Sequence, residues 1–222
     1  MTEVHESAEV NAEHADSVDA VVALTQRTYT LIAADYAGRQ HRGDGDWLST
    51  HLGRMAEELG AGARVADIGC GPGHQTRQLR EKGLRAYGFD LSYDMLGALE
   101  IPGMVQADMR ALPLATGGLD GVWCSAALLH IPRAMVPGVL DEFHRVLRPE
   151  GLLGLTIAEG EGEGWEQVLY RDDEQRRYFV YHAGQAITAA LERAGFRVFR
   201  QIRTSTHRNW LTLHAGRNSG VH

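Results

Sequence analysis

The most informative stretch of the sequence is V-A-D-I-G-C-G-P-G, residues 65–73. An apolar segment enters three closely spaced glycines and a helical pattern follows, so the stretch predicts a strand, a tight turn and a helix. Glycine lets the backbone adopt positive φ and lets a ligand approach the main chain closely. The spacing is G-x-G-x-G and not the G-x-G-x-x-G of dinucleotide-binding turns, because position 74 is His. Asp67, inside the strand, would repel a pyrophosphate but suits the cationic end of an amino acid.

Strand and helix patterns alternate after this turn. We expect strands at 64–68, 85–89, 104–107, 119–125 and 152–157, and helices at 75–81, 93–99 and 133–147. Continuous apolar strands in such an alternation are typical of a parallel sheet covered by helices on both faces. A further helix near 187–194 precedes strands at 196–203 and 208–215, whose link is so short that they must be antiparallel. The sequence therefore predicts an α/β fold with a seven-stranded, mostly parallel sheet and a C-terminal antiparallel hairpin.

The composition fits one domain with an acidic tail. The chain has 222 residues, 44% of them hydrophobic, which is enough for one packed core. We expect residues 1–16 to be disordered and 17–222 to form a single domain. It opens with one helix or two short ones over 18–37, followed by a helix over 48–59. The net charge is −7, and residues 1–20 hold six acids and no Lys or Arg, which leaves −1 for the rest. A nearly neutral body argues against an extended nucleic-acid-binding surface.

The sequence also bears on location and metal content. No apolar run approaches the roughly 18 residues that span a bilayer. The N-terminal residues show no basic and apolar leader. Cys70 and Cys124 are too few for a disulfide framework or a metal cluster. We therefore expect a cytoplasmic protein with reduced thiols, no metal and no membrane partner.

Three acids fall at the ends of consecutive expected strands. Asp67 precedes the glycine turn, Asp90 ends the second strand and Asp108 ends the third. Open parallel sheets bind ligands at this edge, and a carboxylate at the second strand end can accept hydrogen bonds from both ribose hydroxyls. Each acid alone has a plainer interpretation as a helix cap or turn residue. Together with the glycine turn, the three indicate a nucleotide-like ligand with its adenine near the third strand.

By these motifs the chain resembles class I S-adenosylmethionine-dependent methyltransferases of the small methyltransferase type 11 group. The matching segments are residues 67–73, 88–92 with 95–96, 107–108, 120–130 and 147–151. Glu150 departs from the family's usual Gly before the fifth strand, and Thr30 stands where the family often has Asp. The resemblance implies a Rossmann-like fold with S-adenosyl-L-methionine as cofactor and S-adenosyl-L-homocysteine as product. It implies a helical lid at 17–60, a cofactor-binding core at 61–160, an acceptor-pocket segment at 161–185, and a final helix and hairpin at 186–216.

The resemblance also implies the residues that hold the cofactor. They are Tyr29, Tyr36, Asp67, Gly69, Cys70, Gly71, Gly73, Asp90, Leu91, Met95, Ala107, Asp108, Met109 and Ser125. Asp67 would hold the ammonium, Asp90 the ribose hydroxyls, and Asp108 with Met109 the adenine. The two tyrosines would close over the methionine end, although they could also simply pack one helix face.

Methyl transfer depends mainly on positioning, and a general base matters only when the acceptor carries a tightly held proton. We consider His130, after the fourth strand, and His182 as catalytic candidates. His182 ends the aromatic-rich segment 165–182, which is expected either to build the acceptor pocket or to pack as a helix on the sheet. The segment's arginines, Arg171, Arg176 and Arg177, could meet an anionic acceptor, but a solvated helix face is the favoured interpretation. A Gly-rich linker with His41 and Arg42 suits a lid.

Three functions remain open. The favoured one is methylation of an O, N or C atom of a small, aromatic or natural-product-like metabolite, with no nucleic-acid partner. A methyltransferase acting on tRNA or protein would be expected to show a basic face or an added domain. A nicotinamide-dependent oxidoreductase or nucleotide-binding module is disfavoured by the G-x-G-x-G spacing and by Asp67. The sequence predicts neither the acceptor's identity nor the oligomeric state.

Overall fold

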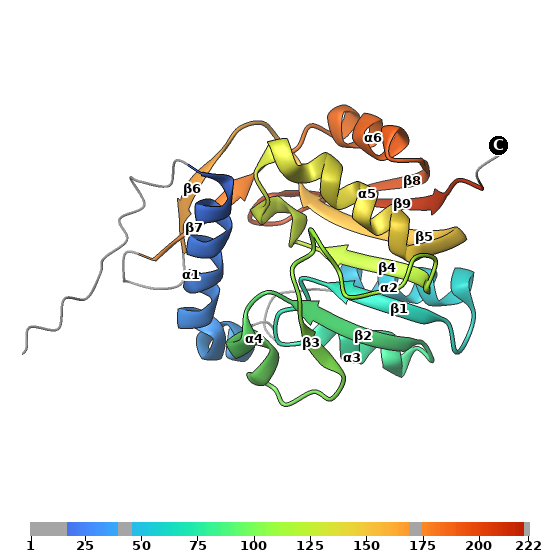
Figure 1. Ribbon diagram of the computed structural model, residues 1–222, viewed down its shortest axis with the longest axis horizontal. Helices are drawn as coiled ribbons and strands as arrows, with labels where there is room; N and C mark the ends of the chain where they lie inside the picture. The colour runs from blue at the N-terminus through green and yellow to red at the C-terminus, as the bar shows by residue number, and fades with distance from the viewer. Residues whose placement is uncertain (1–16, 40–45, 169–174, 220–222) are drawn as a thin grey trace, which may run out of the picture.

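The computed structural model describes residues 17–39, 46–168 and 175–219, and their centre is a seven-stranded sheet (Figure 1). Its strand order is β3-β2-β1-β4-β5-β9-β8. The bounds are β1 Arg64–Ile68, β2 Arg85–Asp90, β3 Met104–Gln106, β4 Leu119–Ser125, β5 Leu147–Ala158, β8 Phe196–Ser205 and β9 Asn209–Arg217. In this order, the first five strands, β3-β2-β1-β4-β5, pair in parallel with their neighbours. Strand β9 pairs antiparallel with both β5 and β8. The expected α/β fold, with its mostly parallel sheet and C-terminal antiparallel hairpin, is confirmed.

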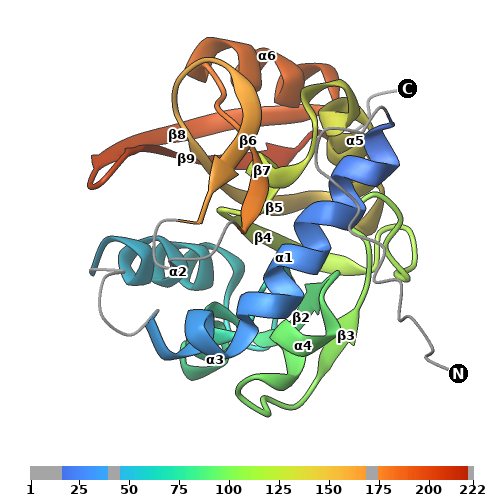
Figure 2. The same cartoon turned by 90° about the vertical axis from the view of Figure 1, so that its left-hand side faces the viewer.

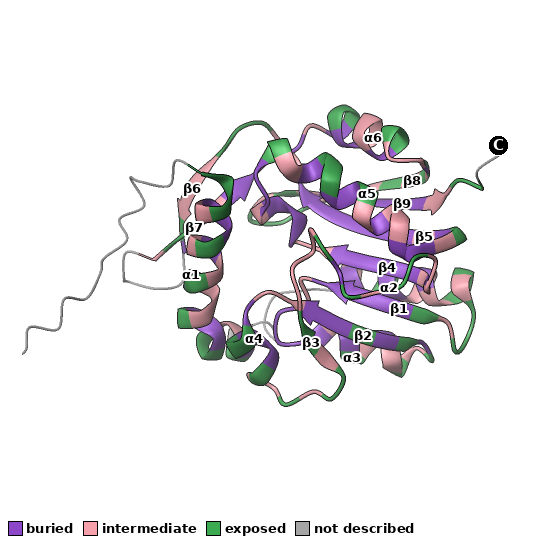
Figure 3. Ribbon diagram, in the orientation of Figure 1, coloured by how far each residue is buried: buried purple, intermediate pink, exposed green. Residues whose placement is uncertain are grey.

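Helices cover both faces because the central strands are apolar on both sides. Along β4, Val122 and Cys124 join the core cluster under α5 (Val136–Val146) and α6 (Gly184–Arg193). Trp123, between them in sequence, joins the cluster under α2 (Asp46–Leu59) and α3 (His74–Glu81). Figure 3 shows the buried residues concentrated along these strands.

Helix α1 (Val18–Arg39) stands across the carboxyl ends of the parallel strands (Figures 1 and 2). It is one continuous helix, where the sequence left one or two open. Beside it lies the short helix α4 (Tyr93–Gly97), which Ser92 caps by accepting a hydrogen bond from the Met95 N–H. This edge of the sheet, where ligands bind in such folds, is thus enclosed by α1.

Several expected bounds were wrong by a few residues. The expected helix 133–147 is a 3₁₀ turn, Arg133–Met135, followed by α5, because Pro137 favours a helix start and opposes continuation from before it. Strand β5 begins at Leu147, where the backbone is already extended, and not at residue 152. Helix α4 and strand β3 are both shorter than expected.

The helical alternative for the aromatic-rich segment 165–182 was wrong. The segment forms a two-stranded antiparallel sheet, β6 Glu163–Gln167 and β7 Arg176–Val180, separate from the main sheet and beside α1 (Figure 2). Trp165 faces Tyr178 across the pair, with ring centroids 5.5 Å apart. Aromatic and β-branched residues in succession favour a strand when a neighbouring surface accepts them. Within the described residues, no helix combines the length and apolar character needed to cross a bilayer.

Some expectations lie outside the described residues. These are the disordered tail at 1–16, the lid linker with His41 and Arg42, and Arg171 in the acceptor-pocket segment.

Two buried histidines join α2 to the main sheet. Nδ1 of His51 lies 3.0 Å from Nε2 of His214 on β9, and both side chains are buried. Burial lowers the pKa of each imidazole from 6.5 to about 4, with Arg54 and Arg200 adding to the effect. Both rings are therefore neutral near neutral pH, and one donates its N–H to the other.

This pair predicts acid sensitivity. Between pH 6.5 and about 4 the unfolded chain binds more protons than the folded one, so stability is complete above pH 6.5 and falls as the pH drops. We expect the free energy of unfolding to fall by on the order of 2 kcal/mol between pH 7 and pH 4.5. His51→Gln should reduce this pH dependence in urea titrations, whereas His207→Gln at an exposed position should not. An unchanged slope in His51→Gln would show that the pair does not control it.

Candidate active site

A cavity of about 530 Å³ lies at the carboxyl ends of the parallel strands, beneath α1. Its wall combines the glycine turn after β1, the ends of β2 and β4, one side of α1, strand β7 and the turn between β8 and β9. Eleven of the expected cofactor residues line it: Tyr29, Tyr36, Asp67, Gly69, Cys70, Gly71, Asp90, Leu91, Met95, Met109 and Ser125. Gly73, Ala107 and Asp108 do not line it.

The three glycines of the turn differ in what they make room for. A Cβ on Gly69 would lie 2.2 Å from the Ala127 side chain, and one on Gly73 would lie 2.6 Å from the Met104 methyl. At these two positions the absence of a side chain lets neighbouring residues of the protein pack against the turn. Gly71 has φ +54°, and its nearest neighbour to a Cβ would be Tyr36 at 3.8 Å. Gly71 is thus the glycine that leaves room for a ligand against the backbone.

Asp90 is fixed at the end of β2 by two backbone donors. Its Oδ2 accepts the N–H of Gly71 and its Oδ1 accepts the N–H of Ser92, each at 2.9 Å. Burial raises the pKa of Asp90 above its usual value, although the two N–H groups favour the charged form. Each oxygen retains acceptor capacity, so the carboxylate can bind ligand hydroxyl groups in the cavity.

Asp67 lies deeper, with 2% of its surface exposed. The hydroxyl of Thr76 donates to its Oδ2 at 2.6 Å. Burial raises the pKa of Asp67 to about 7, and the nearby Asp90 adds to the effect. A buried carboxyl group with this pKa would be stabilised in its charged form by a cationic ligand group.

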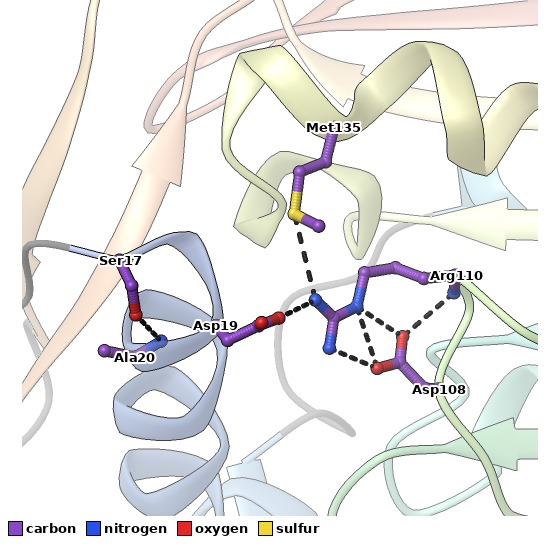
Figure 4. Close-up of polar contacts among 6 residues, drawn as sticks. All are labelled: Ser17, Asp19, Ala20, Asp108, Arg110 and Met135. Atoms are coloured by element: carbon purple, nitrogen blue, oxygen red, sulfur yellow. Dashed lines mark hydrogen bonds and ion pairs between the residues drawn. The ribbon is translucent and has the colours of Figure 1, made fainter.

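Asp108 has a partner of its own. Figure 4 shows its carboxylate facing Arg110, whose Nε and Nη2 donate to Oδ2 at 2.8 and 2.6 Å. The same guanidinium reaches Oδ1 of Asp19 at 2.5 Å, on the first turn of α1. The acid expected to meet adenine is thus engaged outside the cavity, in a contact that ties the start of α1 to the segment after β3.

A chain of hydrogen bonds runs along the cavity wall through Tyr29 and His130. Nδ1 of His130 lies 2.7 Å from the carbonyl oxygen of Tyr178, which can only accept, so we assign the proton to Nδ1. Nε2 then accepts the hydroxyl of Tyr29 at 2.7 Å, and Arg177 donates to that hydroxyl oxygen at 2.9 Å. Burial, with the charge of Arg177, lowers the pKa of His130 to about 3. His130 is a neutral imidazole whose acceptor nitrogen is already occupied.

His182 is not brought together with His130. It is buried, its peptide N–H donates to Ala158, and it does not line the cavity. Burial lowers its pKa to about 4, and its Nε2 has no hydrogen-bond partner among the described residues. Across residues 17–39, 46–168 and 175–219, no cluster of three or more His, Cys, Asp or Glu side chains is placed to hold a metal ion.

Helix α1 connects the two ends of the cavity. On one side, Gln26 donates to the carbonyl of Leu91 at 2.9 Å, and the Thr30 and Ser92 hydroxyls lie 3.1 Å apart. On the other side, Thr28 donates to a backbone carbonyl of β7 and Thr25 accepts a backbone N–H from it. Thr30, the departure from the family pattern, therefore has a clear structural partner.

Sequence reasoning missed part of the wall. Trp47 of α2, with Arg208 and Trp210 of the β8–β9 hairpin, lines the cavity from segments far from the glycine turn. Arg177, expected on a solvated helix face, lies on β7 and also lines it. No local pattern identifies β7 as a strand, since its burial does not alternate along the chain, and only the sheet topology places the β8–β9 turn here.

Comparison with known proteins fits this geometry. Residues 66–155 match the family model described as a methyltransferase domain. Over these residues the chain is similar to methyltransferases that depend on S-adenosylmethionine. Among the curated proteins to which the chain is similar, the malonyl-(acyl-carrier protein) O-methyltransferase of Enterobacter lignolyticus (strain SCF1) is 38% identical over 138 residues. That match covers 58% of this chain and 53% of the relative, so the chain spans about half the length of the curated relatives it matches.

Solved structures share the methyltransferase fold. The 1,6-didemethyltoxoflavin-N1-methyltransferase of Burkholderia thailandensis, with its acceptor and S-adenosylhomocysteine bound, has a TM-score of 0.73 at 20% identity over 91% of both chains. The magnesium protoporphyrin IX methyltransferase of Synechocystis PCC 6803, with bound S-adenosylmethionine, has a TM-score of 0.66 at 20% identity. It covers 89% of this chain and 97% of its own. At these identities the likeness shows the fold.

The hydrogen-bond chain predicts a measurable tautomer. Nitrogen NMR of the protein should show His130 as the neutral Nδ1–H form at pH 7, with protonation only as the pH approaches about 3. Tyr29→Phe removes the donor to Nε2 and should lower the free energy of unfolding by about 1 kcal/mol. Tyr93→Phe is the matched control, because Tyr93 is 72% exposed. An Nε2–H tautomer in the wild type would contradict the assignment.

Proposed function

We propose that this chain transfers the methyl group of S-adenosyl-L-methionine to an O, N or C atom of a small, aromatic or natural-product-like metabolite. The observation that carries the proposal is Asp90, held by two backbone N–H groups at a strand end inside a cavity that also contains a buried Asp67. Two differently placed carboxylates suit a ligand with a diol at one point and a cation at another.

The residues of the cavity fit the cofactor part by part. Asp90 would accept the ribose hydroxyls, Asp67 would face the ammonium, and Gly71 would leave room for the methionine chain. The apolar residues Leu91, Met95 and Met109 would flank the adenine ring. When bound, the cofactor supplies a methyl group activated by the positive charge of its sulfur.

Helix α1 would act as the lid over this site, with residues 17–60 as the lid segment and 61–160 as the cofactor-binding core. Tyr29 and Tyr36 both line the cavity from α1, with ring centroids 5.9 Å apart. An aromatic pair at this point excludes water from the reacting centre, which strengthens positioning. The contact between Asp19 and Arg110 holds the start of this lid in place.

The acceptor would lie at the other end, against the segment 161–185. Trp47, Phe179 and Trp210 line that part of the wall, and aromatic walls suit a flat ligand with few polar anchors. The two solved relatives named above carry flat, conjugated acceptors in their names, which supports this choice. The final helix and hairpin, residues 186–216, would complete the wall through the β8–β9 turn.

His130 would act through Tyr29 and not directly, because its acceptor nitrogen already binds the Tyr29 hydroxyl. A proton leaving the acceptor could pass to the Tyr29 oxygen as the Tyr29 proton moves to Nε2. A pKa of about 3 makes His130 a weak base, so this relay suits acceptors that lose a proton readily. Acceptors that carry no proton would not need the relay. His182, away from the cavity, would act by positioning the β6–β7 hairpin.

Calorimetric titration tests the cofactor assignment. We expect S-adenosylhomocysteine to bind with a Kd in the micromolar range, roughly −7 to −8 kcal/mol, and NAD not to bind. Asp90→Ala should weaken binding by about 1–3 kcal/mol, because the ribose hydroxyls lose a charged acceptor. The matched control is Asp141→Ala, which removes an exposed carboxylate from α5.

The acceptor class is tested separately with labelled S-adenosylmethionine. The panel contains phenols, amines and carboxylates, together with malonyl-(acyl-carrier protein), named for the curated relatives, and tRNA. Turnover of a small molecule supports the proposal. Methylation of tRNA or a protein alone, or NAD binding in place of S-adenosylhomocysteine, contradicts it.

Asp67 predicts a pH dependence of cofactor binding. Its pKa of about 7 means that it is partly protonated at neutral pH, and a bound ammonium favours the charged form. Binding then releases a proton, so affinity should fall by up to about tenfold per unit as the pH drops below 7. Asp67→Asn should bind more weakly at pH 8 and lose this dependence. A wild-type affinity that is constant from pH 8 to pH 6 would contradict the assignment.

A further inference from the structure

The charges around the cavity are divided between its two ends. Asp67 and Asp90 lie at the ends of β1 and β2, against the glycine turn. Two arginines, Arg177 of β7 and Arg208 before β9, line the part formed by the hairpins. The acids are accounted for by the proposed cofactor, but nothing in that proposal uses the arginines.

Both guanidinium groups are positioned by the aromatic wall. Cζ of Arg208 lies 4.2 Å from the ring centroid of Phe179, and Cζ of Arg177 lies 5.5 Å from the same centroid. Nη1 of Arg208 donates to the Tyr181 hydroxyl at 2.8 Å, and its side chain is 11% exposed. Nη1 of Arg177 donates to the Tyr29 hydroxyl at 2.9 Å, and its Nε is inaccessible to solvent. These contacts hold the charges in place before a ligand arrives.

The positive charge acts inside the cavity. Glu166 pairs with Arg208 at 3.2 Å but is itself about one-third exposed, so solvent screens its charge. The charges of Arg177 and Arg208 both contribute to lowering the pKa of His130, whose side chain lines the same wall. A guanidinium beside an apolar, aromatic surface binds a planar carboxylate more strongly than it would in water.

We propose that the methyl acceptor is a flat acid whose carboxylate binds between Arg177 and Arg208. This inference rests on the proposed function, since it assigns the occupant of the acceptor end of the same cavity. A carboxylate oxygen would form the bond to the methyl carbon as the bond from that carbon to the sulfur of S-adenosylmethionine breaks, which leaves a neutral methyl ester and S-adenosylhomocysteine. An ionised carboxylate has no proton to lose, which agrees with a His130 whose acceptor nitrogen is occupied. A free acid and an acid carried on a larger molecule present the same group to the two arginines.

The test compares benzoate with benzamide, which have nearly the same shape and differ in charge. Protein saturated with S-adenosylhomocysteine should bind benzoate at least tenfold more tightly than benzamide in ligand-observed NMR titrations. Arg177→Gln and Arg208→Gln should each reduce this preference at least fivefold, and Arg208→Lys should retain part of it. Arg203→Gln is the matched control, because Arg203 pairs with Glu159 outside the cavity. Unchanged S-adenosylhomocysteine affinity and melting temperature show that each variant is folded.

Equal binding of benzoate and benzamide, binding of neither, or a preference that survives both glutamine variants would overturn the proposal. Failure of the proposed function has a different signature, namely no binding of S-adenosylhomocysteine to the wild type. In that case the same pair of probes is titrated into the protein alone. Comparing labelled methyl transfer to small aromatic acids and to malonyl-(acyl-carrier protein) then distinguishes a free acid from a carrier-bound one.

Discussion

The hydrogen bond from the Gly71 N–H to Asp90 joins the turn after β1 to the end of β2, and the geometry of the cavity depends on it. It forms because parallel pairing brings both strand ends to one edge, and because Gly71 accepts a positive φ. The other oxygen of Asp90 binds the N–H of Ser92, the residue that caps α4. One carboxylate thus fixes a turn, a strand end and a helix start together.

Helix α1 turns this open edge into an enclosed site. Its polar side chains bind the segment after β2 on one side and β7 on the other, and its first turn is held through Arg110. The helix therefore contacts both ends of the cavity. One of its two tyrosines, Tyr29, is hydrogen-bonded to both the neutral His130 and the cation of Arg177.

The main sheet could be predicted from sequence because its strands are apolar on both faces and its helices carry one apolar side. The β6–β7 hairpin could not, because clustered aromatic residues fit a helix or a strand equally well. The strand is stabilised by contacts with α1, more than a hundred residues earlier, through Thr25 and Thr28. Those contacts leave no trace in the local pattern.

The same distinction applies to the site. The residues of the glycine turn and of the β2 end were predictable because each motif is local and positions its own side chains. Arg208 and Trp210 reach the cavity only because β9 inserts between β5 and β8. Asp108 is the opposite case. Its place at a strand end indicated that it binds a ligand, but its carboxylate is bound by Arg110, two residues later.

The attachment of the β6–β7 hairpin has a consequence for how proteins with this fold diversify. Thr25 and Thr28 bind main-chain atoms of β7, and His130 binds the main-chain carbonyl of Tyr178. Docking of the hairpin through these bonds is therefore indifferent to the side chains it displays. Substitutions along it, other than at Arg177, whose side chain binds Tyr29, can reshape this wall of the cavity while α1, the glycine turn and the acids of β1 and β2 stay as they are. The side chains of the hairpin can therefore change between related proteins. One scaffold can in this way acquire a new ligand preference at this wall while the opposite end of the cavity is unchanged.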